Sequence, residues 1–207
     1  NSVAELERQE AKIVDAILEL DADIVGLMEI ENNGTAVQTL VDALNEAAGS
    51  EVYAPILTGV LGTDAITQAF IYKPDVVTPH GAFAALDGDI DPRFDTDRNR
   101  PALTQTFAQN DGGALLTVSV NHFKSKGSAC SGEPVDPDGQ GECNPTRTLA
   151  AEALADWLAT DPTGADTENV LVIGDLNSYD HEDPIVALES AGFVDLEVRP
   201  THRVHAH

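Results

Sequence analysis

The segment from Asn169 to Asp180, N-V-L-V-I-G-D-L-N-S-Y-D, constrains the fold more than any other part of this sequence. Val170 to Ile173 is an apolar, mostly β-branched run that is too short for a helix, so it predicts a buried strand. Asp175 and Asn177 follow Gly174 at a spacing of two, which places both side chains on one face if the chain stays extended. Open α/β sheets bind ligands at such strand ends. The alternative is an ordinary polar turn after a strand.

Four segments have the apolar spacing of helices. The first opens with the capping-box pattern Ser2-Val3-Ala4-Glu5 and ends near Leu20. The third opens with Asn144 as N-cap and Pro145 as its first helical residue. The expected helices cover residues 2–20, 37–44 with closure before Gly49, 144–158, and 183–188 with Gly192 as the stop.

Short apolar runs predict strands at residues 24–28, 52–57, 69–72, 103–107, 115–121 and 170–173. Two long loops are expected, a surface loop over residues 87–98 and a second loop over residues 124–145. Helices and strands interleave, and we find no repeat or linker. We therefore expect one α/β domain with mixed sheets over residues 1–207.

The charge of the chain limits its partners. It has 36 acidic and 11 basic residues, a net charge of -25, which repels nucleic acid at long range and argues against passive coating of DNA. An enzyme with metal ions at its site is compatible with this charge, and solubility is the plainer explanation. No apolar run approaches the ~20 residues of a membrane span. The chain starts at Asn1, so we expect a mature form or an excised piece.

The two cysteines, Cys130 and Cys143, lie in a loop rich in Gly, Ser, Pro and Asp. Two thiols alone make a poor zinc site. A disulfide that closes this short loop, contributing ~3 kcal/mol, would imply an oxidising compartment. The alternative is a pair of free thiols in the cytosol.

Polar groups follow three of the expected strands, at Glu29, His122 and Asp175. Acidic Glu29 and Asp175 suit a hard cation such as Mg²⁺, Mn²⁺ or Ca²⁺. His122 has the chemistry of a general acid or base near neutral pH, or of a phosphate ligand. Alternatively, Glu29 is a solvated strand end and His122 a structural histidine.

Three cations accompany these groups, Arg100, Lys124 and Lys126, and they have the charge to neutralise phosphate. Arg100, which precedes Pro101, is otherwise a plain loop cation.

Four motifs occur in an order that resembles the endonuclease/exonuclease/phosphatase superfamily, the DNase I-like fold, and above all its secreted bacterial extracellular nucleases. They are D-I-V-G-L-M-E-I-E at 23–31, Arg100-Pro101, N-H-F-K-S-K at 121–126 and G-D-L-N-S-Y at 174–179. Residues 5–9, residues 62–66, Arg147 and residues 182–184 are similar to that subgroup. The resemblance covers nearly the whole chain.

The resemblance implies a four-layer α/β/β/α sandwich of two mixed sheets. It also implies divalent-metal-dependent hydrolysis of extracellular DNA, or RNA, by in-line attack of activated water, with Mg²⁺ or Mn²⁺ as cofactor. Glu29 matches the metal-binding glutamate and His122 the histidine on the scissile phosphate. Asp175 matches the aspartate that activates water, Asn177 the asparagine that orients phosphate and nucleophile, and Arg100 a phosphate-side arginine.

Departures from the family pattern leave two further hypotheses open. The family begins with a strand bearing an active-site asparagine and ends with a strand closing on Asp-His, and we expect this chain to lack both strands. A terminal cluster of His202, His205 and His207 and a calcium-like turn at residues 136–142 are weaker candidates for a site. The alternatives are a phosphatase or phospholipid phosphodiesterase of the same fold, and a truncated, non-catalytic metal-binding module.

Overall fold

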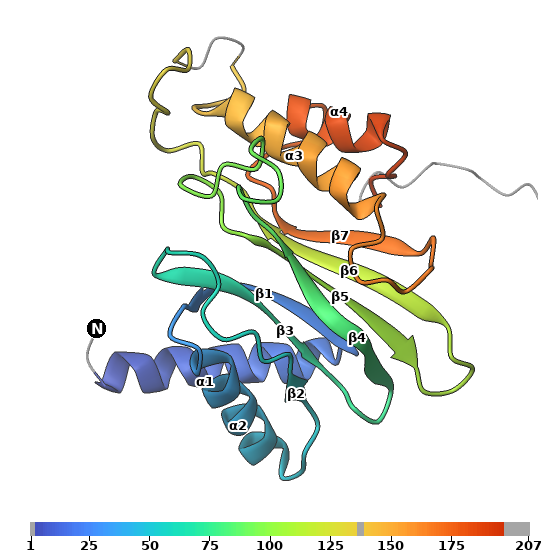
Figure 1. Ribbon diagram of the computed structural model, residues 1–207. Coiled ribbons are helices and arrows are strands. Elements are labelled where there is room, and N and C mark those ends of the chain that lie inside the picture. The colour runs from blue at the N-terminus through green and yellow to red at the C-terminus, as the bar shows by residue number, and fades with distance from the viewer. Residues whose placement is uncertain (1–2, 136–138, 197–207) are drawn as a thin grey trace, which may run out of the picture.

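Two β-sheets lie face to face between two pairs of helices in the computed structural model, which describes residues 3–135 and 139–196 (Figure 1). Sheet A has the strand order β1-β3-β2, and sheet B the order β4-β5-β6-β7. The elements are α1 (Val3–Leu20), β1 (Ile24–Glu31), α2 (Ala36–Ala48), β2 (Ala54–Pro55), β3 (Ile66–Tyr72), β4 (Val77–Leu86), β5 (Ala102–Gln109), β6 (Leu115–His122), α3 (Asn144–Leu158), β7 (Val170–Asp175) and α4 (Asp183–Ser190).

Three apolar cores separate these four layers. One joins α1 and α2 to sheet A, for example through Val14 and Leu44. A second lies between the sheets, where the rings of Phe70 and Phe107 meet edge-to-face with centroids 5.7 Å apart. The third packs α3 and α4 onto sheet B around Leu154. The expected α/β/β/α sandwich is confirmed, with one difference: the pairs of sheet A are all antiparallel, and sheet B is mixed because β6 and β7 run parallel.

Helix ends follow the predicted signals with one exception. α2 stops at Gly49, which adopts the left-handed conformation (φ 72°) that a helix stop requires. The prediction of Asn144 as the N-cap of α3 is wrong. Cys143 occupies that position, with φ 62°. The Asn144 carboxamide instead donates to Asp183 Oδ2 at 2.7 Å, which ties the start of α3 to the start of α4. Ser2, the expected cap of α1, lies outside the described residues.

Three strands differ from the prediction. β1 continues to Glu31, so Glu29 lies within it and not, as expected, at its end. β2 is shorter than expected because the Asn45 carboxamide satisfies the backbone of the preceding residues: it accepts from the Val52 and Tyr53 amides and donates to the Tyr53 carbonyl. β4 was not expected at all. It is an edge strand with Pro79, Gly81 and a bulge between His80 and Ala84, features that weaken the strand signal.

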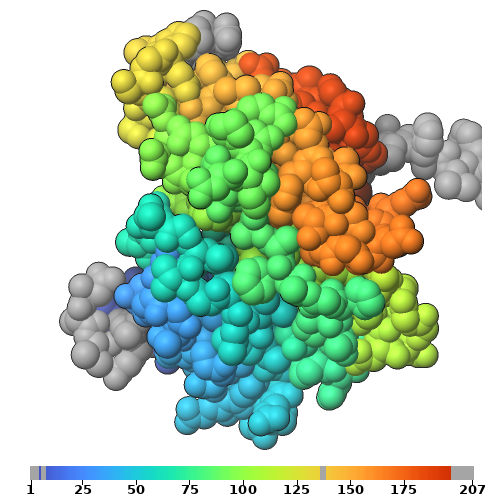
Figure 2. All heavy atoms as spheres, in the orientation of Figure 1, coloured from blue at the N-terminus to red at the C-terminus, as the bar shows by residue number. Residues whose placement is uncertain are grey.

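The segment at residues 87–98 is more than a surface loop. Phe94 is fully buried and packs edge-to-face against Phe123 in the core beneath α3. Arg93 bonds both Asp91 and Asp156 of α3 at 2.7 Å, and Figure 2 shows this loop (green) lying against α3 (orange). The loop is therefore anchored above the end of sheet B. In the part of the chain that the structure describes, no helix has the length and apolarity of a membrane span.

Candidate active site

His122 and Asp175 lie side by side because β6 and β7 are parallel neighbours. His122 pairs in register with Asp175, and Asn121 with Gly174. A Cβ atom at Gly174 would lie 2.1 Å from the Asn121 carbonyl oxygen, and its φ is 118°. Only glycine fits this close approach of two backbones. The glycine before the aspartate thus lets the two catalytic candidates end their strands together.

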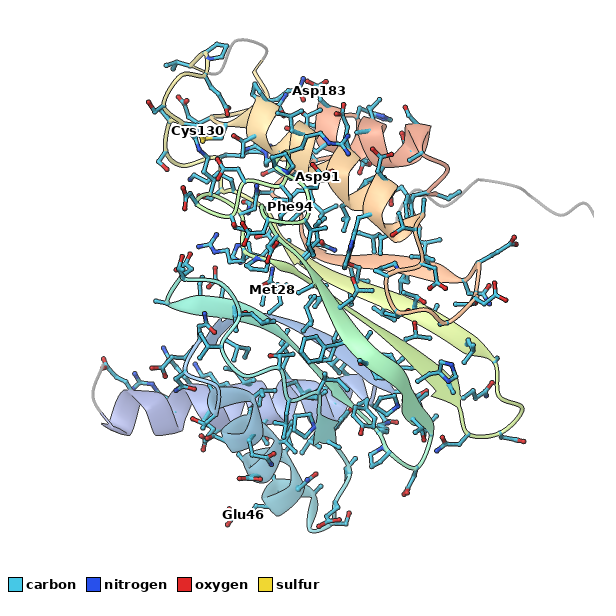
Figure 3. The ribbon with its side chains drawn as sticks, viewed as in Figure 1. Met28, Glu46, Asp91, Phe94, Cys130 and Asp183 are labelled. Atoms are coloured by element: carbon cyan, nitrogen blue, oxygen red, sulfur yellow. A yellow bond between two sulfur atoms is a disulfide. The ribbon has the colours of Figure 1, made fainter. Side chains whose placement is uncertain are left out.

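Glu29 reaches the same place from the other sheet. Gly26 of β1 packs so closely on Ile173 that an added Cβ would lie 2.6 Å from Ile173 Cδ1. Beyond it, the register slips between Leu27 and Ile30, and Glu29 adopts φ 60° in the resulting bulge. Figure 3 shows its neighbour Met28 between the two sheets. Bulges change the direction of side chains. Here the Glu29 carboxylate is 70% exposed, and its Oε1 lies 4.0 Å from His122 Nε2.

The His122 side chain is buried, with 6% exposed. Burial lowers the pKa of His122, and the positive charge of Arg100 lowers it further, against the opposing effects of Asp175, Glu29 and Asp64. Because the ordinary value is about 6.5, the imidazole is neutral at neutral pH. It therefore has one donor and one acceptor nitrogen for a substrate or a water molecule.

The strand does not continue beyond Asp175, so the condition for Asp175 and Asn177 to share one face of an extended chain is not met. β7 ends at Asp175, whose Oδ1 accepts the Asn177 amide at 2.9 Å. Asn177 adopts φ 48°, and its carboxamide nitrogen donates to the Phe123 carbonyl at 3.0 Å. This turn, rather than strand alternation, holds the Asn177 side chain over the residue that follows His122.

Arg100 lies directly beside His122. Its backbone amide donates to the His122 carbonyl at 3.3 Å, and its Nε lies 3.0 Å from Asp64 Oδ2. Gly62 brings the Asp64 segment close, because a Cβ there would lie 2.9 Å from Pro101 Cδ. The guanidinium is thus positioned at the site by the conformation of two loops.

The two lysines after β6 have different surroundings. The Lys124 amide donates to Asn99 Oδ1 at 2.9 Å, and its ammonium donates to Ser128 Oγ at 2.8 Å. Burial lowers the pKa of Lys124, and the neighbouring arginines Arg100, Arg147 and Arg98 lower it further. Lys126, by contrast, bonds both oxygens of Glu182 at 2.6 and 2.7 Å. Lys124 therefore belongs to a group of like charges, whereas Lys126 has its own counter-ion.

A buried arginine and a disulfide hold the loop that carries these lysines. Cys130 and Cys143 form the expected disulfide, with Cα atoms 5.3 Å apart, and Figure 3 shows Cys130 in the loop that leads to α3. Arg147, fully buried, donates to the carbonyls of Lys124 at 3.2 Å and Gln140 at 3.1 Å. The sequence motifs assigned no role to Arg147. A charged residue on the buried face of a predicted helix was the signal that could have indicated one.

Glu29 and Asp175 have the donor chemistry that a hard divalent cation prefers. Both are exposed carboxylates, Glu29 in the bulge of β1 and Asp175 at the end of β7, and both act to raise the pKa of His122. Of three-donor groups within residues 3–135 and 139–196, we find Cys130, Glu133 and Cys143, where the two sulfurs are bonded to each other. A site of one or two carboxylates suits Mg²⁺, which keeps several water ligands in proteins. The calcium-like turn at residues 136–142 lies partly outside the described residues, and the terminal histidines lie entirely outside them.

A groove of about 840 Å³ runs along β7 between α3, α4 and residues 193–196. It is lined by apolar side chains such as Leu158, Val172 and Leu188, and Asp175 lies in its wall. Glu29 and His122 do not contribute to this lining. The groove therefore reaches the candidate site at Asp175.

The chain belongs to the Endonuclease/Exonuclease/phosphatase family, whose sequence model matches residues 1–206. Among solved structures, it is similar to the catalytic domain of human Nocturnin with bound sulfate (18% identity, 90% of this chain and 62% of that chain, TM-score 0.61). It is also similar to a family member from Bacteroides thetaiotaomicron (16%, 89% and 59%, TM-score 0.60) and to D. rerio TDP2 complexed with single-strand DNA product (13%, 90% and 58%, TM-score 0.51).

These similarities establish the fold. The chain spans about three-fifths of the length of each of these solved structures. No curated protein sequence matches it. The family comprises hydrolases of phosphoester bonds, whose members typically use divalent metals.

Proposed function

We propose that this protein is a secreted nuclease that hydrolyses phosphodiester bonds in extracellular DNA, or RNA, with a divalent metal ion. The convergence of Glu29, His122 and Asp175 from three strands of two sheets is the observation that carries this proposal. Residues so distant in sequence meet only because a bulge and two close glycine contacts permit it. Family membership supplies the reaction class.

Each residue has a role that follows from its surroundings. Exposed Asp175 accepts a proton from the attacking water, and neutral His122 donates a hydrogen bond to a phosphate oxygen. Asn177, fixed by its turn, orients the phosphate, and Arg100 balances its charge. Glu29, with Asp175, would hold Mg²⁺ or Mn²⁺, which as a Lewis acid stabilises charge on the phosphoryl group.

The distribution of charge supports an anionic substrate. Of the 11 basic residues, five lie in the segments around the site: Arg98, Arg100, Lys124, Lys126 and Arg147. Arg98, Arg100 and Lys126 are ion-paired with acidic side chains, and Arg147 is buried. Lys124, whose ammonium donates to the Ser128 hydroxyl, is therefore the cation of this group best able to attract a phosphate on a chain of net charge -25. The disulfide supports an oxidising, extracellular location.

Nicking of supercoiled plasmid tests the proposal. The chain is incubated with Mg²⁺ or Mn²⁺, with and without EDTA, next to Asp175→Asn as a matched variant of nearly the same shape. We expect nicking that EDTA and the substitution each abolish. Nicking that persists in the variant would assign the activity to another site or a contaminant. No nicking by a protein that melts cooperatively would contradict the proposal for this chain.

A phosphate-ester substrate is the second candidate, because a mannosyl-6-phosphatase from Bacteroides thetaiotaomicron is also similar in structure (15% identity, TM-score 0.57). Competition separates the two functions. Plasmid DNA should inhibit hydrolysis of a small phosphodiester if nucleic acid is the substrate, and should have little effect on hydrolysis of a phosphate monoester if the protein is a phosphatase.

A further inference from the structure

One aromatic side chain beside the site has no part in the functions described so far. Tyr179 lies in the turn after β7, two residues beyond Asn177, and its side chain is 76% exposed. Single exposed apolar residues are common on proteins and need no explanation. The contacts beneath this ring, however, distinguish it from such a residue.

Tyr179 is held in place from one side. The Lys126 ammonium lies 4.2 Å from the centre of its ring, within the range of a cation–π interaction. Lys126 is itself fixed by both oxygens of Glu182, and the Tyr179 amide donates to Glu182 Oε2 at 3.0 Å. One carboxylate thus positions both the backbone of Tyr179 and the cation on its ring.

The stem of Lys126 is packed as well. It lies directly on Gly141, where an added Cβ would be 2.8 Å from Lys126 Cδ. Gly141 belongs to the loop closed by the Cys130–Cys143 disulfide. One face of the Tyr179 ring therefore lies on Lys126, which Glu182 and Gly141 hold in place. Because the ring is largely exposed, its opposite face must be open to solvent.

A fixed aromatic ring with one open face, in the turn that follows Asp175, has the geometry of a stacking surface for a nucleobase. Base–aromatic stacking needs no particular base, because every base has a π-face. Its neighbours Asp180, His181 and Glu182 are polar, which makes the turn unsuitable for insertion into a lipid surface. An interaction with a planar, polar-edged ring is the better match.

We infer that Tyr179 forms a nucleobase subsite, on which the base of a nucleotide adjoining the scissile phosphate stacks. The inference rests on the proposed function and narrows the substrate. In a duplex the faces of the bases are covered by their neighbours, whereas in a single strand they are available. The protein should therefore prefer single-stranded or locally unpaired nucleic acid.

Binding to two fluorescently labelled oligonucleotides tests this subsite. One is a single strand of thymidines, and the other has the same backbone with abasic sites in place of the bases. Anisotropy is measured in EDTA, where the strand stays intact, and cleavage is followed separately in Mg²⁺. The variants are Tyr179→Ala, Tyr179→Phe and, as a control, Leu20→Ala, an exposed apolar side chain at the end of α1.

We expect Tyr179→Ala to weaken binding of the base-bearing strand about 5- to 150-fold, the range of one lost stacking interaction. Binding of the abasic strand should stay unchanged, and Tyr179→Phe and Leu20→Ala should match the unmodified protein. A duplex of the same length should bind more weakly than the single strand.

The inference is overturned if the protein binds both strands equally or binds neither, or if Tyr179→Ala weakens both to the same degree. Base-dependent binding through Tyr179 without cleavage of either strand would uphold the subsite and contradict the proposed nuclease function. Equal cleavage of both strands by the unmodified protein and by Tyr179→Ala would uphold the proposed nuclease function and contradict the subsite.

Discussion

The two sheets contribute to the candidate site in different ways. Sheet A provides one exposed carboxylate, Glu29, on a bulge with an unfavourable backbone conformation. Sheet B provides His122 and Asp175 from adjacent strands in close backbone contact, surrounded by loops with many hydrogen bonds. Strain concentrated at a functional residue and rigidity in its support are often found together. We therefore expect substitutions in the support of sheet B to lower stability, and removal of the Glu29 side chain from the bulge of sheet A to lower activity while it raises stability.

Asp175→Asn should have the largest effect on activity. Asparagine keeps an oxygen that accepts the Asn177 amide, so the turn and the melting temperature should be unchanged. Loss of the proton acceptor should reduce the rate about 10²- to 10⁴-fold. The rate of phosphodiester hydrolysis and thermal melting are measured on the same preparation. A fall in melting temperature that accounts for the lost activity would remove the evidence for a catalytic role.

Gly174→Ala should have the largest effect on stability. Its Cβ would meet the backbone of Asn121 and adopt a φ that side chains rarely tolerate, so overpacking and strain together should cost about 2–6 kcal/mol. Gly26→Ala is the matched variant, because its nearest neighbour is the flexible end of Ile173, and it should cost about 1–3 kcal/mol. Urea unfolding gives both values. Equal costs would contradict the distinction between a backbone contact and a side-chain contact.

Removal of the disulfide should destabilise the loop at residues 124–145, which follows β6 of sheet B. Replacing Cys130 and Cys143 with serine should lower the free energy of unfolding by about 3 kcal/mol, the value for a loop of this length. The buried guanidinium of Arg147 bonds carbonyls of the same loop, so binding of oligonucleotide should weaken too. Reduction of the unmodified protein is the control. Unchanged binding in both samples would show that Arg147 alone orders the cationic loop.

Glu29→Gly should produce the opposite result on the side of sheet A. Glycine tolerates the positive φ of the bulge without the cost of about 1 kcal/mol that other residues incur, so the protein should become more stable by about that amount. The metal-dependent activity should disappear with the carboxylate. Glu29→Gln, which keeps the backbone cost, should lose the activity without the gain in stability. If glycine destabilises the protein, Glu29 supports the fold in addition to any role in binding metal.

The strand ends of the site could be predicted from sequence because each is a local signal. An apolar run followed by His122 or by Gly174-Asp175 marks the end of β6 or β7, whereas β1 continues past Glu29 to Glu31, so the expected strand end at Glu29 is wrong. That Glu29 and His122 approach within 4.0 Å was implied only by family resemblance, because their proximity depends on how two sheets pack. No local pattern encodes a contact between residues so far apart in sequence.

Other features could not be predicted for related reasons. The bulge that carries Glu29 and the turn that holds Asn177 depend on single backbone angles, which periodicity does not encode. β4 was missed because Pro79 and Gly81 are tolerated only at a sheet edge, and edge position is a property of the assembled sheet. Lys126 was assigned to phosphate by its charge, but Glu182, 56 residues away, pairs with it.

Arg93 should give the smallest effect, at the junction of the 87–98 loop with α3. Its hydrogen bond lowers the pKa of Asp91, so the pair stabilises the fold above the ordinary pKa of aspartate, and this contribution is lost as pH falls through the lower, folded-state value. Because the groups are partly exposed, Arg93→Gln should cost less than about 1 kcal/mol at neutral pH. Unfolding free energies of both proteins should converge as the pH falls below the ordinary pKa of aspartate, about 3.9. A difference that is constant as the pH falls would show that Arg93 acts by packing on α3, and that the support of sheet B at this point is not electrostatic.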